Sequence, residues 1–312
     1  MKIYKDYSEI KFDKNTVISI GTFDGLHLGH ANLLNEVVKR ASDNNSRSFV
    51  VTFEPHPRVV VSESGKVKLL TCMDVKIPLF EKMGIDNLYV INFTKEFSRL
   101  GFDAFVEEYL VKRIGVKHIV LGHDHKFGKD RAGDESKMRL LGEKFDFEIT
   151  TIPAITKEDK IISSTLIRNL LESGETGEAK KFLGRYYEIP GEVVDGVKRG
   201  RLLGFPTANI KPKSDNLLIP ANGVYVVKCD VEERTLYGVM NIGLRPTFGD
   251  VNSVQLEVHI FDFHEDIYGK DITLNFLKRL RPEKKFESKE ELIYQINKDK
   301  KDALRFLGSI IN

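Results

Sequence analysis

The segment from Ile20 to His30 carries the residue types best suited to phosphate chemistry. It reads Ile-Gly-Thr-Phe-Asp-Gly-Leu-His-Leu-Gly-His and follows an apolar run that predicts a strand. A helix beginning here would present unpaired N–H groups to an anion, and His27 and His30 could donate hydrogen bonds to phosphoryl oxygens. The pattern predicts a nucleotide phosphate site. The alternatives are a plain strand–helix turn and a metal site, although no cysteine or third histidine stands nearby.

A second group of candidate residues lies in the other half of the chain. Gly200 and Gly204 permit close approach of the backbone to a ligand, and a Pro-Thr-Ala-Asn sequence follows from Pro206. Thr207 and Asn209 are two residues apart in an extended run, so they share a face where hydroxyl and amide oxygens suit Mg²⁺. Taken alone, this sequence favours a polar turn before an edge strand.

Glu257 is the carboxylate that could act as a general base in that half. Residues 254–261 alternate in polarity, which places Glu257 on the face opposite the apolar side chains. A solvated glutamate is the alternative. Polar segments around Asn241 and Arg245 upstream, and around Arg281 downstream, favour a site.

Two kinds of structural element must position these residues. Strand-like runs alternate with helical patterns in residues 1–185, which predicts a Rossmann-like α/β domain whose ligands bind beyond the carboxyl ends of a parallel sheet. We expect strands at 17–20, 49–53, 88–91, 119–121 and 147–152, and helices over 33–41, over 102–110, from Thr71 onward, and in two pieces over 163–183. Residues 186–312 predict a small all-β barrel with strands at 225–229, 236–242, 254–261 and 272–277, followed by a terminal helix that Ser288 and Glu291 cap.

Composition narrows the class of protein. The chain has 312 residues, enough for two domains, and its 48 Lys+Arg against 46 Asp+Glu give a net charge of +2. This balance argues against a dominant surface for nucleic acid or membrane. Cys72 and Cys229 are far apart in sequence, and we find neither a signal-peptide core nor a long apolar run. We therefore expect a cytoplasmic protein that acts on small molecules.

The first half resembles the His-x-Gly-His nucleotidyltransferases and, among them, the prokaryotic FAD synthetases. The resemblance rests on the histidine segment, TFEPHP at 52–57, GHDHKFG at 122–128 and ISSTLIR at 162–168. It implies transfer of AMP from ATP to FMN, giving FAD and pyrophosphate. It also implies that His27 and His30 bind the ATP phosphates, that Gly21, Phe23, Asp24 and Gly29 form the nucleotide pocket, that Asp124 contacts the adenosine, and that Ser164, Thr165 and Arg168 close on the triphosphate. His125 stands where these enzymes usually have Phe.

Residues 191–296 resemble riboflavin kinase through PTAN at 206–209, NIGLRPTF at 241–248, EVHIFDF at 257–263 and LRPEKKF at 280–286. The resemblance implies phosphorylation of riboflavin to FMN by ATP, with Glu257 as general base. It implies that Thr207 and Asn209 hold Mg²⁺–ATP, and that Arg245 and Arg281 sit on mobile loops over the flavin. Gly200, Gly204, Pro206 and Asn241 would be further binding residues.

Together these resemblances imply a transferase of the bifunctional riboflavin kinase/FMN adenylyltransferase family. We expect the adenylyltransferase domain at 1–185, the kinase domain at 186–312, and ATP, riboflavin, FMN and FAD as substrates and products. Two other interpretations stay open at this point: a nucleotidyltransferase with a different acceptor, and a flavin-binding module without activity.

Overall fold

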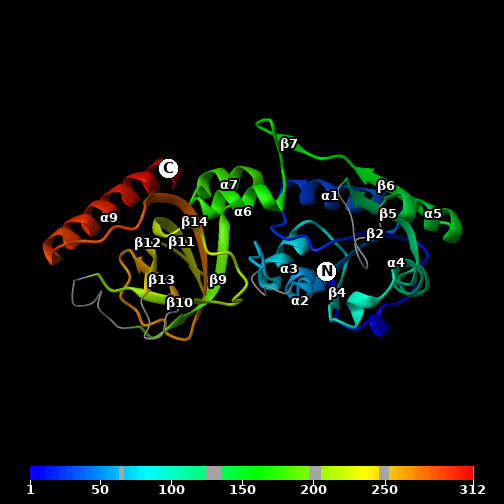
Figure 1. Ribbon diagram of the computed structural model, residues 1–312, viewed down its shortest axis with the longest axis horizontal. Helices are drawn as coiled ribbons and strands as arrows, with labels where there is room; N and C mark the ends of the chain where they lie inside the picture. Colours follow the sequence, from blue (N-terminus) through cyan, green and yellow to red (C-terminus); the bar gives the residue numbers. More distant parts are fainter. Residues whose placement is uncertain (63–66, 124–134, 197–204, 246–252, 312) are drawn as a thin grey trace. The chain divides into compact units, whose positions relative to one another are not determined.

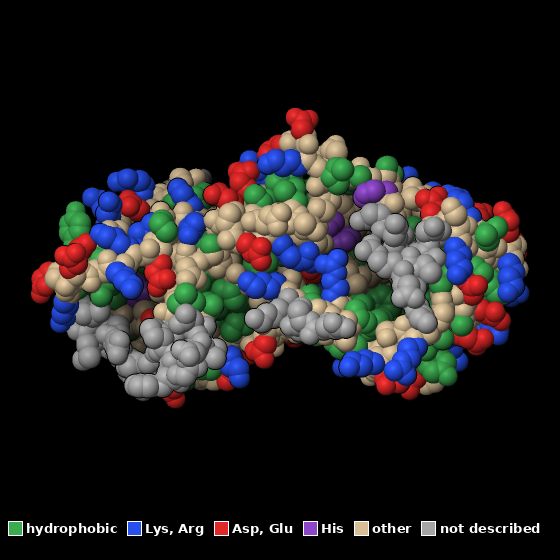
Figure 2. Space-filling view, in the orientation of Figure 1, with side chains coloured by type: hydrophobic (Ala, Val, Ile, Leu, Met, Phe, Trp, Pro, Cys, Tyr) green, Lys and Arg blue, Asp and Glu red, His purple; other side chains and the backbone are tan. Residues whose placement is uncertain are grey.

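The computed structural model describes residues 1–62, 67–123, 135–196, 205–245 and 253–311 (Figure 1). The chain divides into two compact units, Met1–Ser164 and Thr165–Asn312. The domain boundary expected after residue 185 stays a prediction. Within the described ranges, we find no helix whose length and apolar character would let it cross a bilayer. Figure 2 shows Lys and Arg side chains interspersed with Asp and Glu over the visible face.

The first unit is built on a parallel sheet of six strands in the order β1-β4-β3-β2-β5-β6. The strands are β1 (Lys2–Tyr4), β2 (Thr16–Ile20), β3 (Arg47–Glu54), β4 (Asn87–Asn92), β5 (Val116–Gly122) and β6 (Glu148–Ile152). From β2 the chain adds strands on one side, and then returns to place β5 on the other side of β2. Ligands of such sheets bind at this reversal, beyond the carboxyl ends of β2 and β5. The predicted Rossmann-like fold is confirmed.

Helices cover both faces of this sheet. They are α1 (Leu28–Asp43), α2 (Pro57–Val61), α3 (Met73–Lys82), α4 (Phe102–Phe105) and α5 (Glu135–Phe145), with 3-10 turns at Tyr7–Glu9 (η1) and Phe97–Arg99 (η2), a π-helix at Val106–Ile114 (η3), and a small hairpin of β7 (Thr156–Lys157) and β8 (Lys160–Ile161). Alternate residues of β3 enter different cores. Val50 packs in the core that contains α1, whereas Phe49 and Val51 pack with η3. The sheet is therefore buried on both sides, as its apolar strands predict.

The second unit is a closed antiparallel barrel in the order β10-β13-β12-β11-β14-β9. Its elements are α6 (Ser164–Glu172), α7 (Thr176–Leu183), β9 (Tyr187–Val194), β10 (Ala208–Pro212), β11 (Gly223–Val231), β12 (Arg234–Arg245), β13 (Ser253–Ile260), β14 (Asp271–Arg281) and α9 (Lys289–Ile311). Helix α9 lies along the barrel (Figure 1), where Ala303 and Leu307 pack on Val226 and Leu277. The predicted barrel and terminal helix are confirmed.

Candidate active sites

A strained turn joins β2 to α1. Phe23, Gly25 and Leu26 have φ angles of 47°, 86° and 39°. All three lie in the left-handed region, which residues other than glycine rarely adopt. A Cβ atom at Gly25 would also lie 2.8 Å from the Leu70 side chain. Such strain persists only where the surroundings enforce it, and it is frequent at functional sites.

The turn brings His27 and His30 together at the N-terminus of α1. Their rings stack with centroids 3.7 Å apart and an interplanar angle of 13°. His27 is the N-cap of the helix, because its Nδ1 accepts a hydrogen bond from the backbone N–H of His30 at 3.3 Å. This bond leaves the ring proton on Nε2, which is then a donor. Gly29 makes the arrangement possible, since a Cβ there would lie 3.1 Å from the His27 ring.

The ring of Phe23 packs against the histidine pair. Its ring packs edge-on against His30 with a centroid distance of 5.5 Å, and against Phe80 of α3 at 5.6 Å. A Cβ at Gly21 would lie 3.1 Å from the same ring. The structure thus places Gly21 and Phe23 beside the histidines, as expected, and the ring's direct contact is with protein side chains. Their contact with a nucleotide stays a prediction.

Asp24 anchors the turn through its side chain and its backbone. The carboxylate is only 2% exposed, and its Oδ1 accepts from the N–H groups of Leu70 at 2.8 Å and Thr71 at 3.1 Å. Thr71 Oγ1 in turn accepts from the N–H of Gly25 at 3.0 Å, and the Ser164 hydroxyl donates to the Asp24 carbonyl at 2.9 Å. The helix expected from Thr71 therefore begins later, at Met73, because the Thr71 hydroxyl serves the turn instead of capping the helix.

The remaining candidates of the first half are placed only in part. Asp124 and His125 lie outside the described residues, just after the end of β5. Thr165 is exposed in the first turn of α6, and Arg168 is half-buried one turn further on. Both belong to the second compact unit, so their part in a triphosphate site stays a prediction.

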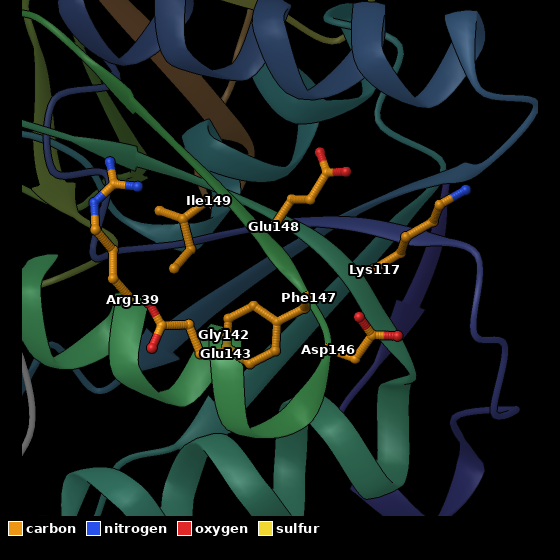
Figure 3. Close-up of a pocket in the computed structure, with 8 residues that line it drawn as sticks. All are labelled: Lys117, Arg139, Gly142, Glu143, Asp146, Phe147, Glu148 and Ile149. Atoms are coloured by element: carbon orange, nitrogen blue, oxygen red, sulfur yellow. The ribbon is translucent and has the colours of Figure 1, made fainter.

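A hollow of about 410 Å³ lies near the amino ends of β5 and β6 (Figure 3). Its lining residues are Lys117, Arg139, Gly142, Glu143, Asp146, Phe147, Glu148 and Ile149. Lys117 and Glu148 stand at the amino ends of β5 and β6. The hollow is therefore separated from the carboxyl edge that carries the histidine turn.

The environment of His118, whose neighbour Glu148 lines this hollow, predicts that the first unit becomes less stable as the pH falls. Burial holds its pKa below the ordinary value, Arg40 acts in the same direction, and Glu148, 3.1 Å from Nδ1, opposes both. Below about pH 6.5 the unfolded chain binds a proton that the folded chain resists, so stability falls as the pH falls. Urea unfolding between about pH 5.5 and pH 8 should show a smaller loss for His118→Gln than for the wild type. Equal losses of stability in the wild type and in His118→Gln would show that His118 is not the group responsible.

The barrel places three predicted polar residues in one row. In the strand register, Glu257 of β13 lies opposite Asn209 of β10 on one side and opposite Asn241 of β12 on the other. Directly paired residues of neighbouring strands point to the same face of a sheet. Since β10 pairs with β9 as well as β13, it is not the edge strand that the sequence favoured. The row brings a carboxylate between two amides.

The row lies on the polar face of β13. Leu256, Val258 and Ile260 are buried, whereas Glu257 is half-buried on the opposite face. The expected alternation is confirmed for these positions, and Val254 departs from it because it is exposed. Thr207 is half-buried directly before β10, and Gly200 and Gly204 lie outside the described residues.

His259 is a site residue that the sequence reasoning did not single out. Its Nδ1 lies 2.8 Å from the carbonyl oxygen of Pro206, and its ring meets Phe205 edge-on at 5.7 Å. These contacts fix the segment leading to Thr207 against β13. Its position two residues after Glu257, on the same face of a strand, was the available signal.

The two arginines expected on mobile loops stand at the ends of strands. Arg245 is the last residue of β12, and Arg281 is the last residue of β14. Arg281 is held by Asp299 of α9, because its Nη2 donates to Oδ2 at 2.8 Å and its Nε lies 3.0 Å from both Oδ1 and Oδ2. Gln295 also donates to Asp299 at 2.8 Å. The loop placement was wrong for Arg281, because a bidentate pair fastens its guanidinium to the terminal helix.

Asp299→Asn should weaken the attachment of α9. The Asp299 side chain is 7% exposed, and the change removes a charge-assisted pair from a mostly buried place. We expect the free energy of unfolding of the barrel to fall by about 1.5–3 kcal/mol in urea denaturation. Asp302→Asn, on the same helix, is the control because its pair with Arg305 at 3.9 Å is exposed. Equal losses of unfolding free energy in the two variants would show that the Arg281–Asp299 pair stabilises the barrel no more than the exposed pair does.

Fold and geometry together define a two-domain transferase for phosphorylated substrates, with a nucleotidyltransferase-type turn in one unit and a carboxylate–amide row in the other. The model of the FAD synthetase family matches residues 9–166, and that of the riboflavin kinase family matches residues 183–307. The chain belongs to the bifunctional riboflavin kinase/FMN adenylyltransferase family. This finding excludes the alternatives of a different acceptor and of a module without activity.

Relatives match over nearly the whole chain. The bifunctional riboflavin kinase/FMN adenylyltransferase of Listeria monocytogenes is 42% identical, over 96% of this chain and 94% of its own. That of Bacillus subtilis is 37% identical, over 95% and 93%. Among solved structures, a Streptococcus pneumoniae chain described as a macrolide-efflux protein superposes with a TM-score of 0.86 at 31% identity, over 96% of this chain and 97% of its own.

Proposed function

We propose that the two units perform successive phosphate reactions on one flavin. The barrel transfers the γ-phosphoryl group of ATP to the 5′-hydroxyl of riboflavin, and the first unit transfers AMP from a second ATP to the FMN so formed. The observation that supports this assignment is the presence of two separate sites, one in each unit and each within the matching family region.

In the first unit, an oxygen of the FMN phosphate attacks the α-phosphorus of ATP, and the bond to pyrophosphate breaks. The attacking group is already an anion, so positioning and neutralisation of charge carry the step and no general base is needed. The N-terminus of α1 holds no acidic residue in its first turn, which leaves its positive field intact for the phosphates. His27 and His30 donate to the phosphoryl oxygens, and Ser164 holds the turn that carries them through its bond to the Asp24 carbonyl.

In the barrel, the nucleophile is an alcohol and must lose a proton. Glu257 accepts the proton of the riboflavin hydroxyl as its oxygen attacks the γ-phosphorus, and ADP leaves. The Thr207 hydroxyl and the Asn209 amide oxygen are hard ligands that fit Mg²⁺, which keeps most of its coordination for phosphates and water. In the described part of the chain we find no group of three or more His, Cys, Asp or Glu side chains that could hold a metal.

We place the enzyme in the cytoplasm, where ATP is available. Cys72 and Cys229 are both free thiols, and Cys229 is buried. Unpaired cysteines of this kind are typical of a reducing compartment.

A time course with riboflavin, ATP and Mg²⁺ tests the proposal. FMN should appear first and FAD second, with one pyrophosphate released for each FAD, as followed by chromatography. A parallel reaction that starts from FMN and ATP isolates the second step. FMN formation without any FAD in either reaction would refute the assignment of the first unit. FAD formation in the reaction that starts from FMN, with neither FMN nor FAD formed in the reaction that starts from riboflavin, would refute that of the barrel.

A further inference from the structure

Gly196 follows β9 and lies directly against the side chain of Asn209. In the barrel register Asn209 of β10 is opposite Val194, the last residue of β9, and Gly196 comes two residues later. A Cβ atom at position 196 would overlap the Nδ2 atom of Asn209 and would lie 2.5 Å from its Cγ. The Asn209 amide therefore occupies space that the side chain of any other residue at position 196 would need.

Space, rather than backbone conformation, is the reason for a glycine at this position. Gly184 and Gly269 of the same unit have φ angles of 78° and 73°, in the left-handed region, whereas the φ angle of Gly196 lies outside that region. An alanine at 196 could therefore keep the same backbone. The atoms that its Cβ would meet are at the end of a side chain that can rotate, so the Asn209 amide would give way and the barrel backbone would stay.

Gly191, within β9, shows the opposite case. A Cβ atom there would lie 2.7 Å from the carbonyl oxygen of Lys211 and 2.6 Å from Cγ2 of Ile210. Ile210 is buried, and the Lys211 carbonyl belongs to the backbone of β10, which pairs with β9. Neither group can move without disturbing this pairing. A methyl group at 191 should therefore destabilise the barrel, whereas one at 196 should displace a single amide.

We propose that Gly196 is a positioning residue of the kinase site, which keeps the Asn209 amide in the row beside Glu257. The inference rests on the proposed function of the barrel, in which the Asn209 oxygen is a ligand for Mg²⁺ and Glu257 accepts a proton. Gly196 acts through Asn209. Rotation of the amide out of the row would move a ligand oxygen away from the phosphates that it helps to place, and a small misplacement is enough to slow such a transfer.

The test is the Gly196→Ala variant of the full chain. It should lower kcat/KM for FMN formation about 10- to 100-fold. FAD formation from FMN and ATP by the same molecules should stay within about twofold of wild type. The urea midpoint of the barrel should match that of the wild type, whereas Gly191→Ala should lower it. Gly308→Ala is the matched control, because no heavy atom lies within 4 Å of its Cβ position, and it should reduce neither the activity nor the midpoint.

Two further measurements show whether Gly196 acts through Asn209. Asn209→Ala should itself lower FMN formation about 10- to 100-fold, and Gly196→Ala should change the rate less than twofold in that background, since the amide that it displaces is gone. A crystal structure of Gly196→Ala should show the Asn209 amide turned away from its wild-type position, with the backbones of β9 and β10 unchanged.

Four results would each overturn the inference: wild-type FMN formation in Gly196→Ala, a urea midpoint lowered as much as in Gly191→Ala, fully additive losses in the double variant, or an Asn209 amide that has not moved. A wild-type protein that forms no FMN would instead refute the proposed function of the barrel.

Discussion

Glu257→Ala should lower the rate of FMN formation about 10²- to 10⁴-fold, the usual contribution of general acid–base catalysis. The side chain stands between Asn209 and Asn241 in the barrel register, and alanine keeps the strand while it removes the proton acceptor. FAD formation from added FMN should stay within about twofold, because the first unit keeps its own site. The two products are measured separately by chromatography with each substrate in turn.

Two further variants separate the chemical role of Glu257 from a structural one. Glu257→Gln keeps the shape of the side chain but cannot accept the proton of the hydroxyl, so it should lose nearly as much activity as alanine. Glu192→Ala removes an exposed carboxylate from β9 of the same barrel and should leave both activities unchanged. If Glu257→Ala kept FMN formation within a few-fold of wild type, the general-base role would be wrong.

His30→Ala should lower FAD formation about 10²- to 10³-fold, the cost of losing one donor aimed at developing charge. The cap of α1 survives the substitution, since it uses the backbone N–H of His30. FMN formation from riboflavin should persist. Release of pyrophosphate from FMN and ATP measures the effect directly.

The matched control for this change is His264→Ala, which removes an exposed histidine of the other unit. Both activities should be retained in this variant. A His30→Ala protein that makes FAD at a rate close to wild type would remove the histidine pair from the mechanism. Equal loss of both products would point to misfolding, which the unfolding transition of each unit would report.

The sequence predicted those parts of the first site that are local in the chain. The apolar run before Gly21 and the histidine spacing were enough to predict a strand, a turn and a helix start. The supports of the turn are distant in sequence, because Asp24 bonds to Leu70 and Thr71, and Ser164 reaches the Asp24 carbonyl. No local pattern reveals such pairs. Lys76 likewise reads as an ordinary polar position on a helix, and only the packing of α3 shows that it is buried.

In the barrel, the alternation along β13 was predictable and the pairing across strands was not. Period-two polarity indicated the face of Glu257, but nothing in one strand says which residue of another lies beside it. Arg281 shows the same limit. Its placement on a loop was an expectation from the resemblance to riboflavin kinase. Its ion pair with Asp299 joins a strand to a helix, and the sequence of neither element indicates the other as its partner.

The row of Asn209, Glu257 and Asn241 makes the kinase chemistry intolerant of a change in strand length. Deletion of one residue between Ser253 and Glu257 would move the alternation of side chains along β13 by one position and turn the carboxylate toward the barrel interior. Because β13 is bonded on both sides, neighbouring strands oppose any slippage that could restore the frame. Substitutions around this row should therefore be tolerated better than insertions or deletions within β13, which belong in the connections between strands.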